Sequence, residues 1–246
     1  MLKVELHAHT ADDPQDRIPY TTSQLIDRVA ALGYDALAIT LHDRQLDVAP
    51  LRAYAADRGV TLISGIERTI EGRHVLLLNF RRGAEEVQSF DDLARLRRRE
   101  SGLVVAPHPF FPGSTCLRGL LDRHAALFDA IEYNAMFVPG VNFNRAAVRW
   151  AAVHGKPVVG NGDVHRLVQA GRTWSLVDAA RDPDSICEAI RAGHVRVEAT
   201  PLSPFAAARI MGGLLLQDLR PAGPLRGTRP TYSTYAGAPG VSSRAT

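Results

Sequence analysis

Short apolar runs alternate with segments of helical periodicity along most of the chain. The pattern predicts strands over residues 2–6, 36–40, 60–65, 103–106, 130–132, 157–160, 173–177 and 195–197, and an extended hairpin over 66–80 that turns at Glu71-Gly72. It predicts helices over 21–33, 48–58, 85–101, 115–124, 142–154 and 182–193. Strands that alternate with helices form a parallel sheet with helices outside. About seven such units favour a distorted (β/α)7 barrel of the α/β class over an open sheet.

Two of the predicted helices have clear signals at their ends. Thr21 and Gln24 have the spacing of a capping box, and Gly33 ends that helix. Asp182 followed by Pro183 gives the last helix an N-cap and a proline in its first turn. These two helices are therefore supported by end signals as well as by periodicity.

The composition is that of one domain of ordinary size. Hydrophobic residues make up 46% of the 246 residues, which is enough for a single core, and the net charge is only +3. Part of the basic excess lies in the run 95–99, which is typical of a solvated helix face, with a nucleic-acid contact as the minor interpretation. We expect one domain over residues 1–219 and a disordered tail, rich in Pro, Gly, Ser, Thr and Arg, over 220–246.

The chain shows no sequence signal of export or membrane insertion. Residues 1–5 already carry charge, so they do not predict a signal peptide, and no apolar run approaches the roughly 18 residues of a membrane span. Cys116 and Cys187 are the only cysteines and belong to no C-x-x-C pair, which excludes a disulfide framework and a cysteine zinc site. We expect a cytoplasmic protein with no membrane partner.

Most of the histidines follow a predicted strand or lie on the hairpin, and acids stand at equivalent places. The set is His7, His9, His42, Glu67, His74, His108, Glu132, Asn134, Asp163 and His165. The carboxyl ends of barrel strands open onto one face, so we expect these side chains to converge. His124, His154 and His194 lie near helix ends, and we expect them to be packing or capping residues.

The mixture of imidazole and carboxylate side chains indicates a metal site, because together they suit zinc, iron or manganese. In the H-x-H pair of His7 and His9, alternate side chains of a strand lie on one face, so both rings reach one ion. A carboxylate such as Glu67 is able to bridge two ions, which lie roughly 3.5–4 Å apart in two-metal sites. The pattern predicts a hydrolase with two or three divalent metal ions.

The strand-end segments resemble the motif series of the PHP (polymerase and histidinol phosphatase) superfamily. They are His7-Ala8-His9-Thr10, 38–43, Gly65-Ile66-Glu67, Pro107-His108-Pro109, 131–134 and 162–165, in the order of the family. The resemblance covers about residues 2–204, and the ordered set is far more specific than one H-x-H pair. It implies a PHP-like distorted barrel with a trinuclear metal site.

The resemblance also implies how the ligands divide. His7, His9 and Asp163 would hold a first metal. Glu67 would bridge the first and second metals, and His74 and His108 would complete the second. Glu67 and Asp163 would also be the catalytic carboxylates.

The third metal would be held by His42 and His165 with an acid from the loop after His9. Asp16 fits the aspartate of the family best, and Asp12 and Asp13 compete with it. Leu41 departs from the family, whose members usually carry an aspartate before this histidine. That departure bears on the third site rather than on the first two.

Several residues near the site keep two interpretations. Glu132 supports the ligands or, as the minor interpretation, binds metal itself. Asn134 orients substrate or stabilises its loop, and Phe110 and Phe111 either wall the pocket or pack inside. Arginine binds two phosphate oxygens at once, so the candidate substrate residues, besides Asn134, are Arg44 and Arg145, with Arg68 and Arg172 as alternatives.

We predict a phosphoesterase that hydrolyses a small phosphomonoester, such as histidinol phosphate or a nucleotide, with a hydroxide activated by the metals. The short stretch between Glu67 and His108 has no room for the helical subdomain that PHP nucleotide phosphatases commonly insert, which lowers the nucleotide option. Nucleic acid is a less favoured substrate.

Two other classes of function stay open. One is a PHP module that is non-catalytic or processes nucleic acid. The other is hydrolysis at carbon of the amidohydrolase type, which usually uses a lysine beside the metals. The two lysines, Lys3 and Lys156, do not stand at the carboxyl end of a predicted strand.

Overall fold

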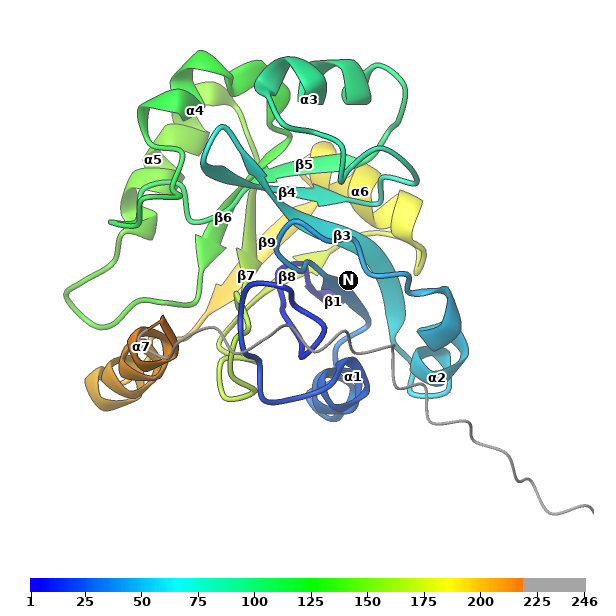
Figure 1. Cartoon of the computed structure of the whole chain (residues 1–246), viewed down its shortest axis with the longest axis vertical. Helices are drawn as coiled ribbons and strands as arrows, with labels where there is room; N and C mark the ends of the chain where they lie inside the picture. Colours follow the sequence, from blue (N-terminus) through cyan, green and yellow to red (C-terminus); the bar gives the residue numbers. More distant parts are fainter. Residues whose placement is uncertain (219–246) are drawn as a thin grey trace, which may run out of the picture.

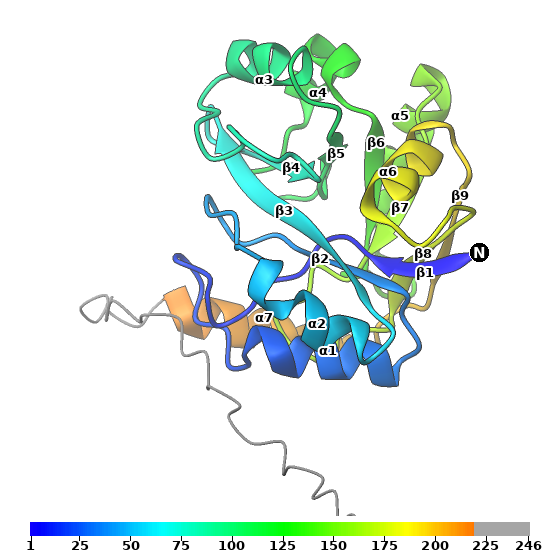
Figure 2. The ribbon, with the colours of Figure 1, turned by 90° about the vertical axis from the view of Figure 1, so that its right-hand side faces the viewer.

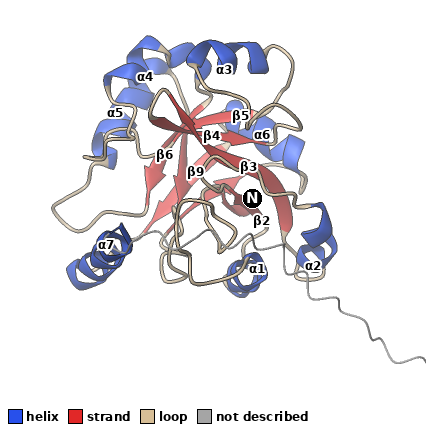
Figure 3. Ribbon diagram, in the orientation of Figure 1, coloured by secondary structure: helices blue, strands red, loops and turns tan. Residues whose placement is uncertain are grey.

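Nine strands form one strongly curved, barrel-like sheet with the helices on its outside (Figures 1, 2 and 3). The computed structural model describes residues 1–218. The strand order across the sheet is β7-β6-β5-β4-β3-β2-β1-β8-β9. The distorted barrel predicted from the sequence is confirmed, while the predicted tail over 220–246 lies outside the described residues.

The sheet is mixed rather than parallel. Its strands are β1 Leu2–Glu5, β2 Ala36–Ile39, β3 Thr61–Ile70, β4 Arg73–Leu78, β5 Leu103–Ala106, β6 Ala130–Asn134, β7 Val158–Asn161, β8 Thr173–Val177 and β9 Val195–Ala199. β4 and β8 run antiparallel to both of their neighbours. The expectation of a parallel sheet is therefore wrong for β8. A parallel return needs a crossover, usually a helix, and residues 162–172 contain none.

The sheet almost closes where β7 meets β8. The backbone N–H of Gly160 donates to Oγ of Ser175 at 2.8 Å, and the same hydroxyl donates back to the carbonyl oxygen of Gly160 at 3.1 Å. A Cβ at Gly160 would lie 2.7 Å from the carbonyl oxygen of Trp174. Glycine is therefore required for the two strands to approach, and one serine side chain joins them.

β3 and β4 form the hairpin predicted from the sequence. The turn lies at Glu71 and Gly72, whose φ angles of 48° and 75° suit a two-residue hairpin loop. The predicted strand over 60–65 and the first arm of the hairpin are one continuous strand, β3. Because the hairpin carries Glu67 and His74, its register fixes how these two residues lie relative to each other.

The barrel interior is apolar near the amino ends of the strands. Val4, Ala36, Ile63, Leu103 and Ala130 belong to one buried cluster there, and Ile186 and Ile190 of α6 (Pro183–Arg191) pack against it. Alternate positions of a strand face the same side. The inward positions therefore continue along β3 and β6 to Glu67 and Glu132, where the interior becomes polar.

The remaining helices are α1 Thr22–Ala31, α2 Arg52–Ala56, α3 Phe90–Arg97, α4 Gly119–Arg123, α5 Asn144–His154 and α7 Pro204–Asp218, with short 3-10 helices at Ala49–Leu51 and Ala125–Leu127. The capping box of Thr21 and Gln24 is confirmed, and Asp182 caps α6 as predicted. The helix predicted over 85–101 is too long, because Ser89 caps a helix that begins at Phe90. The sequence pattern did not predict α7.

Over residues 1–218, no helix reaches the length and apolarity that crossing a bilayer requires.

Candidate metal centre

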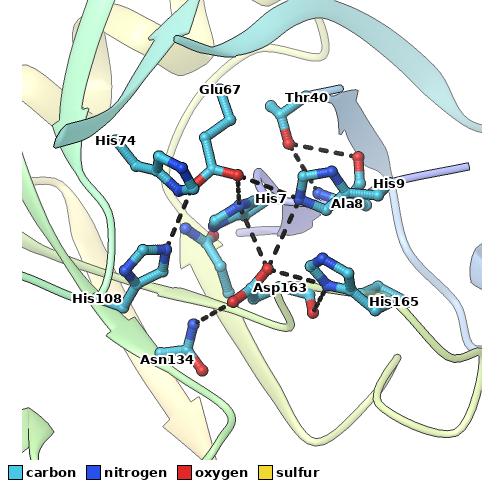
Figure 4. A network of polar contacts seen from close by, with 12 residues as sticks. His7, Ala8, His9, Thr40, Glu67, His74, His108, Asn134, Asp163 and His165 are labelled. Carbon is cyan, nitrogen blue, oxygen red and sulfur yellow. Dashed lines mark hydrogen bonds and ion pairs between the residues drawn. The ribbon is translucent and has the colours of Figure 1, made fainter. Parts of the chain in front are cut away.

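The ligand-type side chains gather where the strands end (Figure 4). His7 and His9 follow β1, His42 follows β2, Glu67 lies in β3, His74 lies in β4, His108 follows β5, and Asp163 and His165 follow β7. Isolated parallel bridges, Ala8 with Val164 and His42 with Glu67, continue the sheet into these loops. The backbone therefore stays ordered by strand pairing up to the residues that form the site.

Glu67 lies at the centre of the cluster with only 1% of its side chain exposed. Its Oε1 lies 2.8 Å from Nδ1 of His74 and 3.2 Å from Nε2 of His108. Its Oε2 faces three Nε2 atoms, those of His7 at 3.3 Å, His9 at 3.4 Å and His42 at 3.1 Å. The two oxygens of one carboxylate thus face two different sets of histidines.

The Nε2 atoms of His7 and His9 are buried and have no hydrogen-bond partner among the described residues. Oδ1 of Asp163 lies 3.4 Å from the first and 3.7 Å from the second. Buried polar atoms are almost always satisfied, so two partnerless nitrogens that converge between two carboxylates indicate a cation-binding position. A divalent cation fits this donor set of imidazole nitrogen and carboxylate oxygen.

A second region of the cluster lies around His165. Its Nε2 lies 2.9 Å from Oδ2 of Asp16, and its Nδ1 lies 3.3 Å from Oδ1 of Asp163. Nδ1 of His42 lies 3.8 Å from the same Asp16 oxygen. Asp16, His42 and His165 therefore lie together. His165 lies on the side of Asp163 away from Asn134 (Figure 4).

Glu132 supports the cluster from within the barrel. Its Oε1 accepts hydrogen bonds from Nδ1 of His7 at 2.8 Å and from Nδ2 of Asn161 at 2.9 Å. Its Oε2 accepts the backbone N–H of His108 at 2.8 Å. A carboxylate on the outer nitrogen of a metal-binding histidine fixes the tautomer and the ring orientation. Glu132 is placed to do this for His7.

Two of these residues have an unusual backbone conformation. The φ angles of His108 and Asp163 are 30° and 47°, in the left-handed region that side chains other than glycine rarely adopt. Such conformations persist only where the surrounding structure imposes them, and they cluster at functional sites. Here they direct a histidine and a carboxylate toward Glu67 and His7.

The charges of the cluster depend on one another. Burial alone would raise the pKa of Glu67, but the facing His7, His74 and His42 hold this pKa well below its usual range. Burial would lower the pKa of His7, but the carboxylates of Asp163, Glu132 and Glu67 raise it well above its usual range. The pKa of His9 is lowered by burial and by the neighbouring His165 and His42.

Four groups of side chains have ligand atoms within 4.8 Å of one another. They are His7-His9-Glu67, His9-His42-His165, His42-Glu67-His74 and His7-His108-Glu132. Glu67 belongs to two of the groups, which suits a bridging carboxylate. His74 groups with His42, whereas the resemblance implied that it shares a metal with His108.

Part of the sequence matches a known family, and the fold matches solved structures. A family model described as PHP-associated matches residues 141–195. The fold is similar to that of PsfC from Pseudomonas syringae (TM-score 0.61, 17% identity, 89% of this chain and 99% of that chain). It is also similar to a putative metal-dependent phosphoesterase from Bifidobacterium adolescentis (TM-score 0.53, 17% identity, 77% of this chain and 96% of that chain).

A third similar structure is the lesion-specific endonuclease PfuEndoQ from Pyrococcus furiosus (TM-score 0.51, 15% identity). The match covers 80% of this chain and 57% of that chain. No curated protein matches the chain in sequence. The family-model match over residues 141–195 supports the PHP resemblance found in the sequence motifs, and the solved structures share the fold.

The loop after His9 supplies two aspartates to the cluster. Asp16 contacts His165, while Asp13 contacts His9 and His42 through Oδ2. Asp12 instead accepts a hydrogen bond from Oγ1 of Thr22 at 3.0 Å. Leu41, which departs from the PHP pattern, is fully buried in an apolar cluster and brings no polar atom to the site.

The three predicted substrate residues lie in different surroundings. Asn134 is in the cluster, and its Nδ2 donates to Oδ2 of Asp163 at 3.0 Å. Arg44 is exposed and donates to the carbonyl oxygen of Asp12 at 3.3 Å. Arg145 is an exposed residue in the first turn of α5. The alternative Arg68 is held by Oδ1 of Asp43 at 2.7 Å.

The two phenylalanines after His108 have different surroundings. Phe110 packs against the buried core under α3, α4 and α5. Phe111 stands edge-on to the ring of His108, with 6.4 Å between centroids, and its ring lies 5.4 Å from that of Phe143. Phe143 is 41% exposed. An aromatic pair therefore borders the cluster beside His108.

Sequence reasoning missed several residues that contact the ligands. Glu5 is fully buried, and its Oε1 accepts the backbone N–H of His7 at 3.1 Å and of Gly162 at 2.9 Å. Sγ of Cys116 lies 3.5 Å from Nδ1 of His108. The place of Glu5 in a predicted strand, two residues before His7, was a signal for it, whereas nothing in the sequence relates Cys116 to His108.

The three histidines predicted to lie outside the site are engaged elsewhere or exposed. His124 stacks on Phe90 with 3.9 Å between centroids, and Nδ1 of His154 lies 2.9 Å from the carbonyl oxygen of Trp150. His194 is exposed. The six histidines of the cluster thus lie apart from these three, which the sequence pattern also placed near helix ends.

Proposed function

We propose that the protein is a metal-dependent hydrolase of phosphate esters. The observation that carries this proposal is the arrangement around Glu67, whose two oxygens face two sets of histidines while the Nε2 atoms of His7 and His9 have no partner. Such an arrangement suits a carboxylate that bridges two cations. The similarity to a putative metal-dependent phosphoesterase supports the same reaction class.

The residues that would hold the cations are those named from the sequence: His7, His9, Asp16, His42, Glu67, His74, His108, Asp163 and His165. Bound divalent cations would lower the pKa of a water molecule and offset the negative charge of the phosphate ester. The protein would contribute the spacing of the ligands and a water-poor surrounding. We take zinc, manganese and iron as the candidates, because the donors are imidazole and carboxylate.

Asp163 and Asn134 would be the chain's own groups nearest to the reacting atoms. The side chain of Asp163 is 17% exposed, against 1% for Glu67, so substrate and solvent reach Asp163 first. Its Oδ2 accepts the Asn134 amide, which leaves Oδ1 directed at His7 and His165. Asp163 would thus hold a hydrogen bond from the attacking water in a fixed direction, and Asn134 would keep the carboxylate in place.

The organic part of the ester would lie against Phe111 and Phe143. Phe111 borders His108, and the two rings form the aromatic edge of the cluster. Aromatic rings bind flat apolar groups by stacking or edge-on contact. We therefore propose a small phosphomonoester with a ring in its organic part as the substrate.

A phosphodiester of nucleic acid is the second candidate, because the fold is similar to that of a lesion-specific endonuclease. The basic run 95–99 gives this candidate limited support. Within it, Arg97 is committed to Asp129 through two hydrogen bonds of 2.7 and 2.8 Å. A screen has to include both kinds of ester.

The test is hydrolysis by protein loaded separately with zinc, manganese or iron. The substrates would be phenyl phosphate, glycerol phosphate, histidinol phosphate, nucleoside monophosphates, a diaryl phosphodiester and an abasic duplex oligonucleotide. We expect turnover of monoesters that is lost in His9→Ala and kept in His154→Ala. Turnover of the diester or the oligonucleotide alone would establish the second candidate. No turnover of any ester by metal-loaded protein would overturn the proposal.

A further inference from the structure

We propose that Asp13 is a positioning residue that holds the rings of both His9 and His42 by a single oxygen and so couples two metal positions. The inference rests on the proposed function in one respect, that these histidines bind metal. It assigns to Asp13 a role different from that of a ligand. Asp13 would affect the orientation of the two rings and not the choice of ester.

The contacts of Oδ2 are the first support. This oxygen lies 2.8 Å from Nδ1 of His9 and 3.1 Å from Nδ1 of His42, and it accepts the backbone N–H of His42 at 3.0 Å. The side chain of Asp13 is fully buried. These three contacts place the carboxylate as an acceptor for both rings.

The contacts of Oδ1 are the second support. This oxygen accepts the backbone N–H groups of Gln15 at 2.9 Å and of Asp16 at 3.0 Å. Both oxygens of Asp13 are thus engaged with the chain itself. The turn fixed in this way carries Asp16, whose Oδ2 contacts His165. Asp13 organises the loop that presents a neighbouring ligand and is not itself directed at a cation.

The consequence for the two histidines is a fixed tautomer. When both Nδ1–H groups donate to Asp13, each ring presents its unprotonated Nε2, and these atoms lie 3.4 Å and 3.1 Å from Oε2 of Glu67. The ring of His9 also lies 4.5 Å from that of His42, between centroids. One carboxylate therefore orients two rings that follow different strands, β1 and β2.

Glu132 offers a comparison on the other side of Glu67. It accepts Nδ1 of one ring, that of His7, and only the backbone of His108. Removal of its charge should disturb one histidine ring. Removal of the Asp13 charge should disturb two.

The test uses zinc, which is diamagnetic, and protein with 15N-labelled histidine. Asp13→Asn keeps the shape and removes the charge. We expect the nuclear magnetic resonance signals of His9 and His42 to lose the Nδ1–H tautomer together, and zinc affinity, measured by competition with a chelator, to fall about 10–100-fold at two positions. Asp12→Asn is the matched control, because Asp12 bonds Thr22 and no histidine, and it should leave both readouts unchanged.

Unchanged tautomers with weakened zinc binding would make Asp13 a direct ligand and overturn the proposal. A change at only one of the two histidines would overturn the sharing. If Asp13→Asn does not fold, Asp13→Glu keeps the charge and moves the oxygens by one methylene. It should weaken zinc binding at the same two positions, and unaltered zinc binding in it would count against the proposal.

The two proposals fail in different ways. Neither zinc competition nor the histidine signals require turnover. Loss of both tautomers in a protein that hydrolyses no ester would overturn the proposed function and support the role of Asp13. Wild-type zinc binding in Asp13→Asn, with an active wild-type enzyme, would do the reverse.

Discussion

Nδ1 of His74 lies 2.8 Å from Oε1 of Glu67, and the register of the hairpin explains the contact. Glu67 pairs with Leu76, so His74, two residues along the opposite strand, is a diagonal neighbour on the same face. A shift of one residue in this register would turn His74 to the other face. The tight turn at Glu71 and Gly72 therefore helps to place a ligand at the centre of the site.

The first prediction concerns Glu67→Gln, which keeps the shape and removes the charge. We expect metal content to fall and turnover to drop by at least about 100-fold, because the repulsion between neighbouring cations is no longer offset. Elemental analysis and steady-state kinetics measure the two effects. Added metal should restore His42→Ala more readily than Glu67→Gln. Full occupancy with near-normal turnover in Glu67→Gln would place the bridge elsewhere, with Asp163 the next candidate.

The second prediction separates ligands from packing residues. His9→Ala and Asp163→Ala should abolish activity while the circular dichroism spectrum stays that of the wild type, because each removes a ligand rather than core packing. His124→Ala removes only the stacking on Phe90, so it should lower the melting temperature slightly and keep turnover. Equal loss of activity in His124→Ala and His9→Ala would show that the histidines are wrongly sorted.

The sequence predicted the parts of the fold that local rules determine. The capping box at Thr21, the hairpin turn at Gly72 and the strand-end positions of His7 and His9 are all properties of a few neighbouring residues. The direction of β8 is different, because it depends on pairing with β1, which is remote in sequence. No local pattern distinguishes an antiparallel return from a parallel one.

The candidate site was predictable to the same extent. The candidate ligands could be named because they follow a strand or lie on the hairpin. The choice among Asp12, Asp13 and Asp16 depends on how one loop folds against His9, His42 and His165. Arginines such as Arg44 were named from charge alone. Their exposure is decided by the path of the loops, which composition does not give.

The third prediction concerns protons. Burial would lower the pKa of His165, but the carboxylates of Asp163 and Asp16 raise it to about 10, and the pKa of His42 is also raised above its usual value. Metal-free protein therefore keeps the ring of His165 protonated near neutral pH. Because a cation binds the neutral imidazole, zinc binding should release protons, and zinc affinity should rise with pH between about 6 and 8.

Calorimetry in buffers of different ionisation enthalpy measures the protons released. The same shift gives the sign for stability without metal. The stabilisation from His165 is complete below its unfolded pKa of 6.5 and is lost as the pH rises toward about 10. A pH-independent zinc affinity would contradict this account.

The fourth prediction concerns the closure of the sheet. Gly160→Ala would force a Cβ against the carbonyl oxygen of Trp174. We expect the free energy of unfolding to fall by about 1–3 kcal/mol. Gly119→Ala is the control, because a Cβ there meets no atom within 4 Å, and it should change stability by less than about 0.5 kcal/mol. Chemical denaturation of metal-free protein compares the two. Equal effects would mean that the contact of β7 with β8 contributes no specific constraint.

The antiparallel pairing of β1 with β8 affects how the protein is made. β1 leaves the ribosome before the other eight strands of the sheet, and its partner β8 is complete only after Val177 has been synthesised. Until then β1 has an unpaired edge beside the carboxylate of Glu5, which still awaits the N–H of Gly162. Pairing between such distant segments is slow and leaves strand edges open to wrong partners. The sheet therefore stays unfinished until β8 has been made, and a chaperone that shields strand edges should raise the yield of folded protein.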